Sequence, residues 1–287
     1  MNTLAASGQI WRAGSATSAG RRHVERGSPG QDAADAGAGP RPFALVCDGR
    51  GSSELSHHGS AAAKGAFARM LRCAEPLLRR LLDDLDPDDP LAHAGWRDVV
   101  TLFLGALGQA QESLALEHGV ATSEFEFTIS AAVVGRRGVG ILQLGDSCLV
   151  VERQGQTSLA APPQTGAFAG ETNFVSDGAD SLKHADTRIL SGDQLTGILA
   201  FTDGVAARWL HHRTLEPAPG VGQILGRLTT GAWNGQRLQD YLNQPFWSVD
   251  GDDDRGVAFL VRVPEQTTSA ESPESPDASG VTGGQVS

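Results

Sequence analysis

Four apolar segments of strand length in this chain lie within four residues of an aspartate. They are residues 43–47 before Asp48, residues 141–144 before Asp146, residues 198–201 before Asp203, and residues 257–261 after Asp253. Each segment puts a carboxylate where a buried strand leaves the core, and an unpaired carboxylate is costly to bury. Such groups are normally paired, hydrogen-bonded or bound to a metal, and Mg²⁺ and Mn²⁺ prefer oxygen ligands.

An aspartate followed by glycine at a strand end is also a common turn, and Asp48-Gly49 and Asp203-Gly204 both fit that description. Any single instance therefore indicates a turn more readily than a ligand. If the strands share a sheet or sandwich, the recurrence of the pattern favours a common rim of carboxylates.

Strand-like and helix-like patterns alternate irregularly along the chain. The strand-like runs cover residues 42–47, 125–134, 138–151, 197–201 and 256–263. The pair 125–134 and 138–151 flanks Gly135-Arg136-Arg137, which predicts a hairpin. Residues 31–42, rich in Ala, Gly, Asp and Pro, are expected to form an exposed turn between two strands.

Two apolar stripes at spacings of three and four predict long helices. One covers residues 62–82, where Pro76 should kink or restart the helix, and the other covers residues 96–114 and ends near Gly119. Since strands and helices do not alternate regularly, a doubly wound parallel sheet is disfavoured. The pattern indicates an α+β layered domain of mainly antiparallel strands.

Charge and composition set the domain limits and exclude one class of partner. Residues 264–287 contain mostly Ser, Thr, Pro, Gly and Glu, which predicts a disordered acidic tail after a single domain over residues 1–263. The formal net charge of −11 argues against nucleic-acid binding, which needs clustered Lys and Arg.

Three widely spaced cysteines give neither a zinc pair nor a disulfide framework. The first twenty residues lack an apolar signal-peptide core, and no run approaches ~18 consecutive apolar residues. A cytoplasmic protein without membrane association is therefore expected.

Several short motifs occur in an order that resembles one phosphatase family. They are Gly30-Gln31-Asp32-Ala33, Val46-Cys47-Asp48-Gly49-Arg50-Gly51, Phe127-Thr128 with Leu144-Gly145-Asp146-Ser147, Ala200-Phe201-Thr202-Asp203-Gly204-Val205, and Asp253-Asp254-Arg255-Gly256-Val257. Each is weak alone, but together they resemble the PPM family of type-2C metal-dependent serine/threonine protein phosphatases. The resemblance spans about residues 14–263 and looks like a compact bacterial branch.

The resemblance implies a four-layer α-β-β-α sandwich of two mainly antiparallel sheets flanked by helices. It implies two divalent cations, Mn²⁺ or Mg²⁺, that activate a water molecule to attack phosphorus. Asp48 would bridge the two ions, and the backbone carbonyl of Gly49 would help hold the second. The remaining ligand positions are Asp203 and Asp253 on one ion, Asp32 beside the second ion through water, and Asp146 with Asp203 at an optional third position.

Four positions depart from the family pattern. Gly27 stands where an arginine often contacts substrate phosphate, so Arg26 and His23 are the nearest candidate contacts. Gln31 replaces an acid, Gly256 replaces a hydroxyl residue, and Ala207 replaces an aspartate of the third metal position.

The implied function is hydrolysis of phosphoserine or phosphothreonine in a protein substrate, in a pair with a serine/threonine kinase. One alternative is a catalytically weak or inactive phosphatase-like module that binds a phosphoprotein. The other is an unrelated α+β binding domain whose aspartates are only turn residues.

Overall fold

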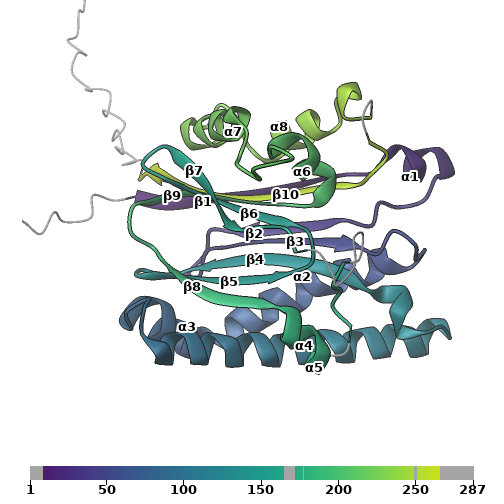
Figure 1. Cartoon of the computed structure of the whole chain (residues 1–287), viewed down its shortest axis with the longest axis horizontal. Coiled ribbons are helices and arrows are strands. Elements are labelled where there is room, and N and C mark those ends of the chain that lie inside the picture. Colours follow the sequence, from purple (N-terminus) through teal and green to yellow (C-terminus); the bar gives the residue numbers. More distant parts are fainter. Residues whose placement is uncertain (1–8, 165–171, 177, 249–250, 266–287) are drawn as a thin grey trace, which may run out of the picture.

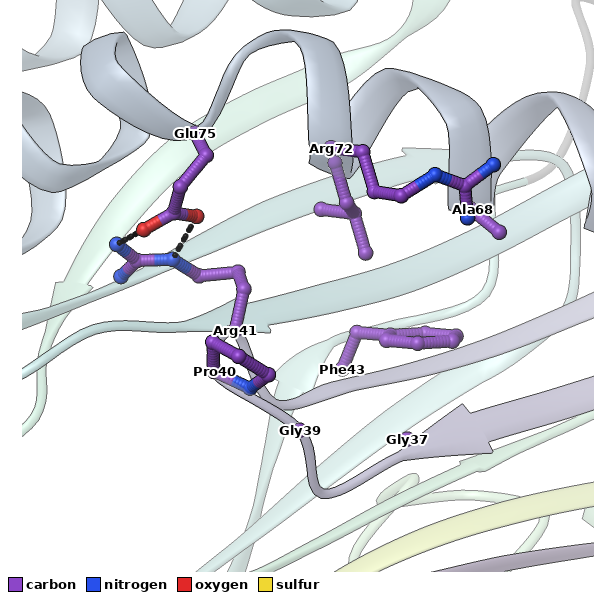
Figure 2. Close-up of a pocket in the computed structure, with 9 residues that line it drawn as sticks. Gly37, Gly39, Pro40, Arg41, Phe43, Ala68, Arg72 and Glu75 are labelled. Atoms are coloured by element: carbon purple, nitrogen blue, oxygen red, sulfur yellow. Dashed lines mark hydrogen bonds and ion pairs between the residues drawn. The ribbon is translucent and has the colours of Figure 1, made fainter.

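The computed structural model describes residues 9–164, 172–176, 178–248 and 251–265. Within them, two antiparallel five-stranded sheets pack face to face, with helices on both outer faces (Figure 1). This is the predicted α+β four-layer sandwich. The tail predicted at residues 264–287 lies almost wholly outside the described residues.

The first sheet has the strand order β1-β10-β9-β6-β7. Its strands are β1 (Gln9–Ser18), β6 (Cys148–Arg153), β7 (Gln156–Ala161), β9 (Leu195–Phe201) and β10 (Arg255–Pro264). Its outer face is covered by α6 (Asp203–Trp209), α7 (Pro219–Thr230) and α8 (Gly235–Leu242), which lie above the sheet in Figure 1.

The second sheet has the order β2-β3-β4-β5-β8. Its strands are β2 (Ala33–Gly37), β3 (Phe43–Gly49), β4 (Phe127–Val134), β5 (Gly138–Leu144) and β8 (Asp186–Ser191). Two long helices, α2 (Ser56–Cys73) and α4 (Pro90–His118), cover its outer face (Figure 1). The shorter elements are α1 (Arg21–Arg26), α3 (Glu75–Arg79), η1 (Arg80–Asp84), η2 (Thr122–Phe125), α5 (Gly178–His184) and η3 (Pro245–Ser248).

The helix predictions are confirmed where local signals were strong. The first predicted helix breaks at Ala74, just before Pro76, and continues as α3 and a π-helical turn. The second ends at Gly119, whose φ of 68° is the left-handed geometry that glycine adopts easily.

By length and composition alone, α4 could cross a membrane, but that criterion also fits core helices. Here one of its faces packs on the second sheet through Trp96, Val100 and Phe103.

One turn prediction and one strand prediction were wrong. Residues 31–42 are not simply an exposed turn, because they contain β2, where Ala33 and Ala34 are buried against β3. Residues 138–151 are not one strand. The chain turns at Gly145, with φ of 102°, and passes from β5 in one sheet to β6 in the other. This crossing carries Asp146 to the end of the sandwich.

Candidate metal centre

Three aspartates from separate parts of the chain meet where the two sheets are joined. Asp48 lies near the end of β3, Asp146 lies in the crossing between β5 and β6, and Asp203 is the first residue of α6. Each offers a carboxylate oxygen, and these three oxygens lie within 4.8 Å of one another. Such a set of converging oxygen atoms suits a hard divalent cation.

Among the described residues, hydrogen bonds satisfy only one of the two carboxylate oxygens of Asp146. Its Oδ2 accepts a hydrogen bond from Thr172 Oγ1 at 2.8 Å. Its Oδ1 is buried, and no hydrogen-bond donor reaches it from the residues that the structure describes. Buried polar atoms are nearly always satisfied, so this oxygen is a ready cation ligand. The donor set therefore fits the divalent metal that the sequence predicts.

Burial and mutual repulsion raise the pKa values of these carboxyls. Burial is the largest cause for Asp48, whose pKa lies well above its usual range, followed by the charges of Asp32 and Asp203. Burial and then the charge of Asp253 raise the pKa of Asp203 to about 7. A bound cation relieves both effects, because it favours the ionised carboxylates.

Asp32 and Asp253, two further predicted ligands, lie beside this group. Asp32 accepts a hydrogen bond from Thr202 Oγ1 at 2.7 Å, and its pKa is raised well above the usual value, first by burial and then by nearby charges that include Asp254. Asp253 is exposed as a whole residue, while partial burial of its carboxyl followed by the charge of Asp254 raises its pKa. Asp32 and Asp253 are thus electrostatic neighbours of the three converging carboxylates.

Gly49, whose carbonyl is the remaining predicted ligand, is packed tightly against the segment before β2. A Cβ atom at Gly49 would lie 2.9 Å from the carbonyl oxygen of Gln31 and 2.7 Å from Ser56 Oγ. Only glycine allows this approach, which keeps the ends of β3 and the Gln31-Asp32 segment together.

Asp254 has a role that the sequence did not reveal. It is 4% exposed and accepts hydrogen bonds from Gly20 N at 2.5 Å, from His23 Nδ1 at 2.9 Å and from Gln31 N. The carboxylate therefore fixes α1 and the residue before Asp32 to the start of β10. The acidic run at residues 252–254 was visible in the sequence, but it did not indicate which acid faced inward.

The cations on α1 lie beside the acidic end of the sandwich. Arg26, a predicted phosphate contact, is exposed, and Gly27 ends the helix in the left-handed conformation with φ of 64°. Arg22 was not predicted, yet its charge lowers the pKa of Asp253, and its Nε lies 3.7 Å from Asp252 Oδ2. His23 is held by Asp254.

We expect cation binding to compete with protonation of Asp203. The folded pKa of Asp203, about 7, exceeds its unfolded value of 3.8. The contribution of this carboxyl to the free energy of unfolding is therefore fully present below the unfolded pKa. That stability is lost as the pH rises from about 4 to about 7, because the carboxylate must then ionise inside the protein. The increase in melting temperature caused by Mg²⁺ should therefore grow between about pH 6 and about pH 8. Thermal unfolding with EDTA or Mg²⁺ across this range is the measurement, and a pH-independent increase would contradict the expectation.

A sandwich of two antiparallel sheets between helical layers, with clustered carboxylates at one end, is the architecture that the PPM resemblance implied. A family model described as protein phosphatase 2C matches residues 19–244. The chain belongs to this family. Asp253 and Asp254 lie just beyond the matched residues.

Known proteins similar to the chain agree with this assignment. The serine/threonine-protein phosphatase 3 of Escherichia coli K12 is 25% identical over 264 residues, which cover 88% of this chain and 98% of that protein. A solved catalytic domain of the serine/threonine phosphatase PstP, in complex with two manganese ions, has a TM-score of 0.58 at 15% identity, covering 89% of this chain and 100% of that one. Staphylococcus aureus Stp1 has a TM-score of 0.55 at 15% identity, covering 91% and 98%. These two structures show a shared fold.

Proposed function

We propose that this protein hydrolyses phosphoserine and phosphothreonine in protein substrates, with Mn²⁺ or Mg²⁺ as cofactor, in a pair with a serine/threonine kinase in the cytoplasm. The observation that carries the proposal is the convergence of Asp48, Asp146 and Asp203, with the buried Asp146 Oδ1 left without a donor. The family assignment and the manganese ions of the PstP structure support it.

In this proposal the carboxylates hold the cations and α1 faces the substrate. Asp48, Asp203, Asp253, Asp32 and the Gly49 carbonyl would hold two cations. Asp146 with Asp203 would offer a further position. When bound, the cations lower the pKa of a coordinated water and offset the charge of the phosphoryl oxygens. Arg22 and Arg26, exposed on α1, are available to attract the phosphate.

Hydrolysis of a phosphothreonine peptide and of p-nitrophenyl phosphate, with EDTA and then with Mn²⁺ or Mg²⁺, tests the proposal. We expect turnover of both compounds only with added cation. Cation binding measured by calorimetry without any turnover would contradict the catalytic proposal.

A phosphoprotein-binding module without turnover is the second candidate. Two positions favour it, because Gly27 is a helix cap with no side chain for phosphate, and the Gln31 amide donates to the backbone carbonyl of Ser53. Retained binding of the phosphopeptide, with no hydrolysis in the presence of either cation, would support this candidate.

A further inference from the structure

His23 and Asp254 form a partly buried imidazole–carboxylate pair outside the three converging carboxylates. His23 Nδ1 lies 2.9 Å from Asp254 Oδ1, and the His23 side chain is 21% exposed while that of Asp254 is 5% exposed. Among the described residues, Nε2 of His23 makes no hydrogen bond. The carboxylate of Asp254 thus holds Nδ1 of the imidazole, and Nε2 is available to contact a substrate.

The hydrogen bonds of Asp254 set the orientation of this pair. The carboxylate also accepts from the backbone N–H groups of Gly20 and Gln31, so its position does not depend on His23 alone. The contact between Asp254 Oδ1 and His23 Nδ1 therefore fixes the orientation of the imidazole ring, as in other His–Asp arrangements.

Two sets of contacts made by Asp254 place the pair next to the candidate metal centre. Asp254 directly follows Asp253, and its bond to Gln31 N places it one residue from Asp32. In addition, the backbone of Asp254 packs against the start of α6, because a Cβ at Gly204 would lie 2.0 Å from the Asp254 carbonyl oxygen. In Figure 1, α1 lies at the same end of the sandwich as the arrowhead of β3, and Asp48 is the next-to-last residue of β3. His23 is therefore at the edge of the carboxylate group and not within it.

We propose that His23 is the general acid that protonates the leaving seryl or threonyl oxygen, and that Asp254 is its positioning residue. This inference rests on the proposed phosphatase activity. The bond from phosphorus to the substrate oxygen breaks, its electron pair stays on that oxygen, and the proton of His23 Nε2 goes there to give the free hydroxyl. Water supplies the new oxygen on phosphorus and loses one proton to solvent, and a proton from solvent then restores the imidazolium.

The leaving group decides how much a general acid contributes. A serine or threonine alkoxide is a strong base and needs a proton as the bond breaks, whereas p-nitrophenolate is a weak base and leaves without one. Positioned proton transfer contributes about 10²- to 10⁴-fold to a rate. Loss of a phosphate contact, by contrast, slows both substrates to a similar degree.

Two substitutions of His23 distinguish a general acid from a phosphate contact. His23→Asn keeps an amide donor near the position of Nδ1, and His23→Gln keeps one near the position of Nε2, but neither amide transfers a proton. For both variants we expect kcat on a phosphothreonine peptide to fall by about 10²-fold or more, while kcat on p-nitrophenyl phosphate stays within about fivefold. His93→Gln is the matched control, because His93 lies on α4 and its Nδ1 accepts a hydrogen bond from the backbone N–H of Ile189 on β8 at 3.4 Å.

Equal losses on the two substrates, or no loss on either, would overturn the proposal while leaving the phosphatase activity intact. A wild-type protein inactive on both substrates would overturn the phosphatase activity and this role together. Asp254→Asn should lower the peptide rate in the same selective way. It should also shift the Nδ1 signal of His23 in long-range ¹H–¹⁵N spectra, and an unchanged signal would remove Asp254 as the positioning residue.

Discussion

Asp48→Asn abolishes cation-dependent hydrolysis, by an expected factor of about 10³ or more, since several kcal/mol of electrostatic stabilisation depend on the bound cations. The ligand oxygen of Asp48 lies within 4.8 Å of those of Asp146 and Asp203, which places Asp48 in the candidate cation site. The loss should appear with the peptide and with p-nitrophenyl phosphate alike, because both require the cations.

The same substitution should make the cation-free protein more stable. Asp48 is a buried carboxyl whose pKa is raised by burial and by four neighbouring aspartates, so a neutral amide removes unfavourable charge near neutral pH. We therefore expect the melting temperature in EDTA to rise and the increase caused by Mg²⁺ to shrink.

Asp193→Asn is the control for this prediction, because Asp193 is exposed in the turn between β8 and β9. It should leave activity and the Mg²⁺ response unchanged. If Asp48→Asn retained activity comparable to this control, Asp48 would not be a cation ligand.

Gly204→Ala disrupts the metal centre without changing a ligand. A Cβ at Gly204 would lie 2.0 Å from the carbonyl oxygen of Asp254, and backbone atoms cannot yield as the tip of a flexible side chain can. The start of α6, which carries Asp203, must then move away from the segment just before β10, which contains Asp253. We expect destabilisation by about 1–3 kcal/mol, as for overpacked sites, and at least tenfold weaker cation binding, since a 1.4 kcal/mol loss is tenfold.

Gly226→Ala provides the comparison, since a Cβ at Gly226 in α7 meets no atom within 4 Å. It should preserve cation binding and leave stability unchanged or slightly increased, because alanine is the better helix former. Calorimetric titration with Mn²⁺ and urea unfolding measure the two effects. Equal cation affinity in the two variants would show that the contact between α6 and β10 does not set the site geometry.

Much of the fold was predictable because its signals are local. The stripe from residue 62 to 82, the kink at Pro76 and the stop at Gly119 depend on residues within a few turns of each other. The hairpin of β4 and β5 was predicted by two apolar runs around a short turn. α7 was missed although Val221, Ile224, Leu225 and Leu228 follow helical spacing in the sequence.

Other elements had no clear local signal. β2 is composed of Ala, Asp and Gly, and it is a strand because β3 supplies its hydrogen-bond partners and α2 covers it. The division of residues 138–151 depends on two sheets being present, since each half pairs with a different set of strands.

The sequence by itself determined the kind of centre this protein contains, because aspartates at the ends of apolar strands favour a site for hard cations. The tertiary structure decided how these residues are arranged. It brought Asp146 together with Asp48 and Asp203, left Asp253 at the side, and turned Asp254 inward to hold His23. The reason is that cation sites depend on distances of a few ångströms between segments far apart in sequence. Those distances are fixed only when the two sheets pack and Gly49, Gly145 and Gly204 allow the backbones to approach.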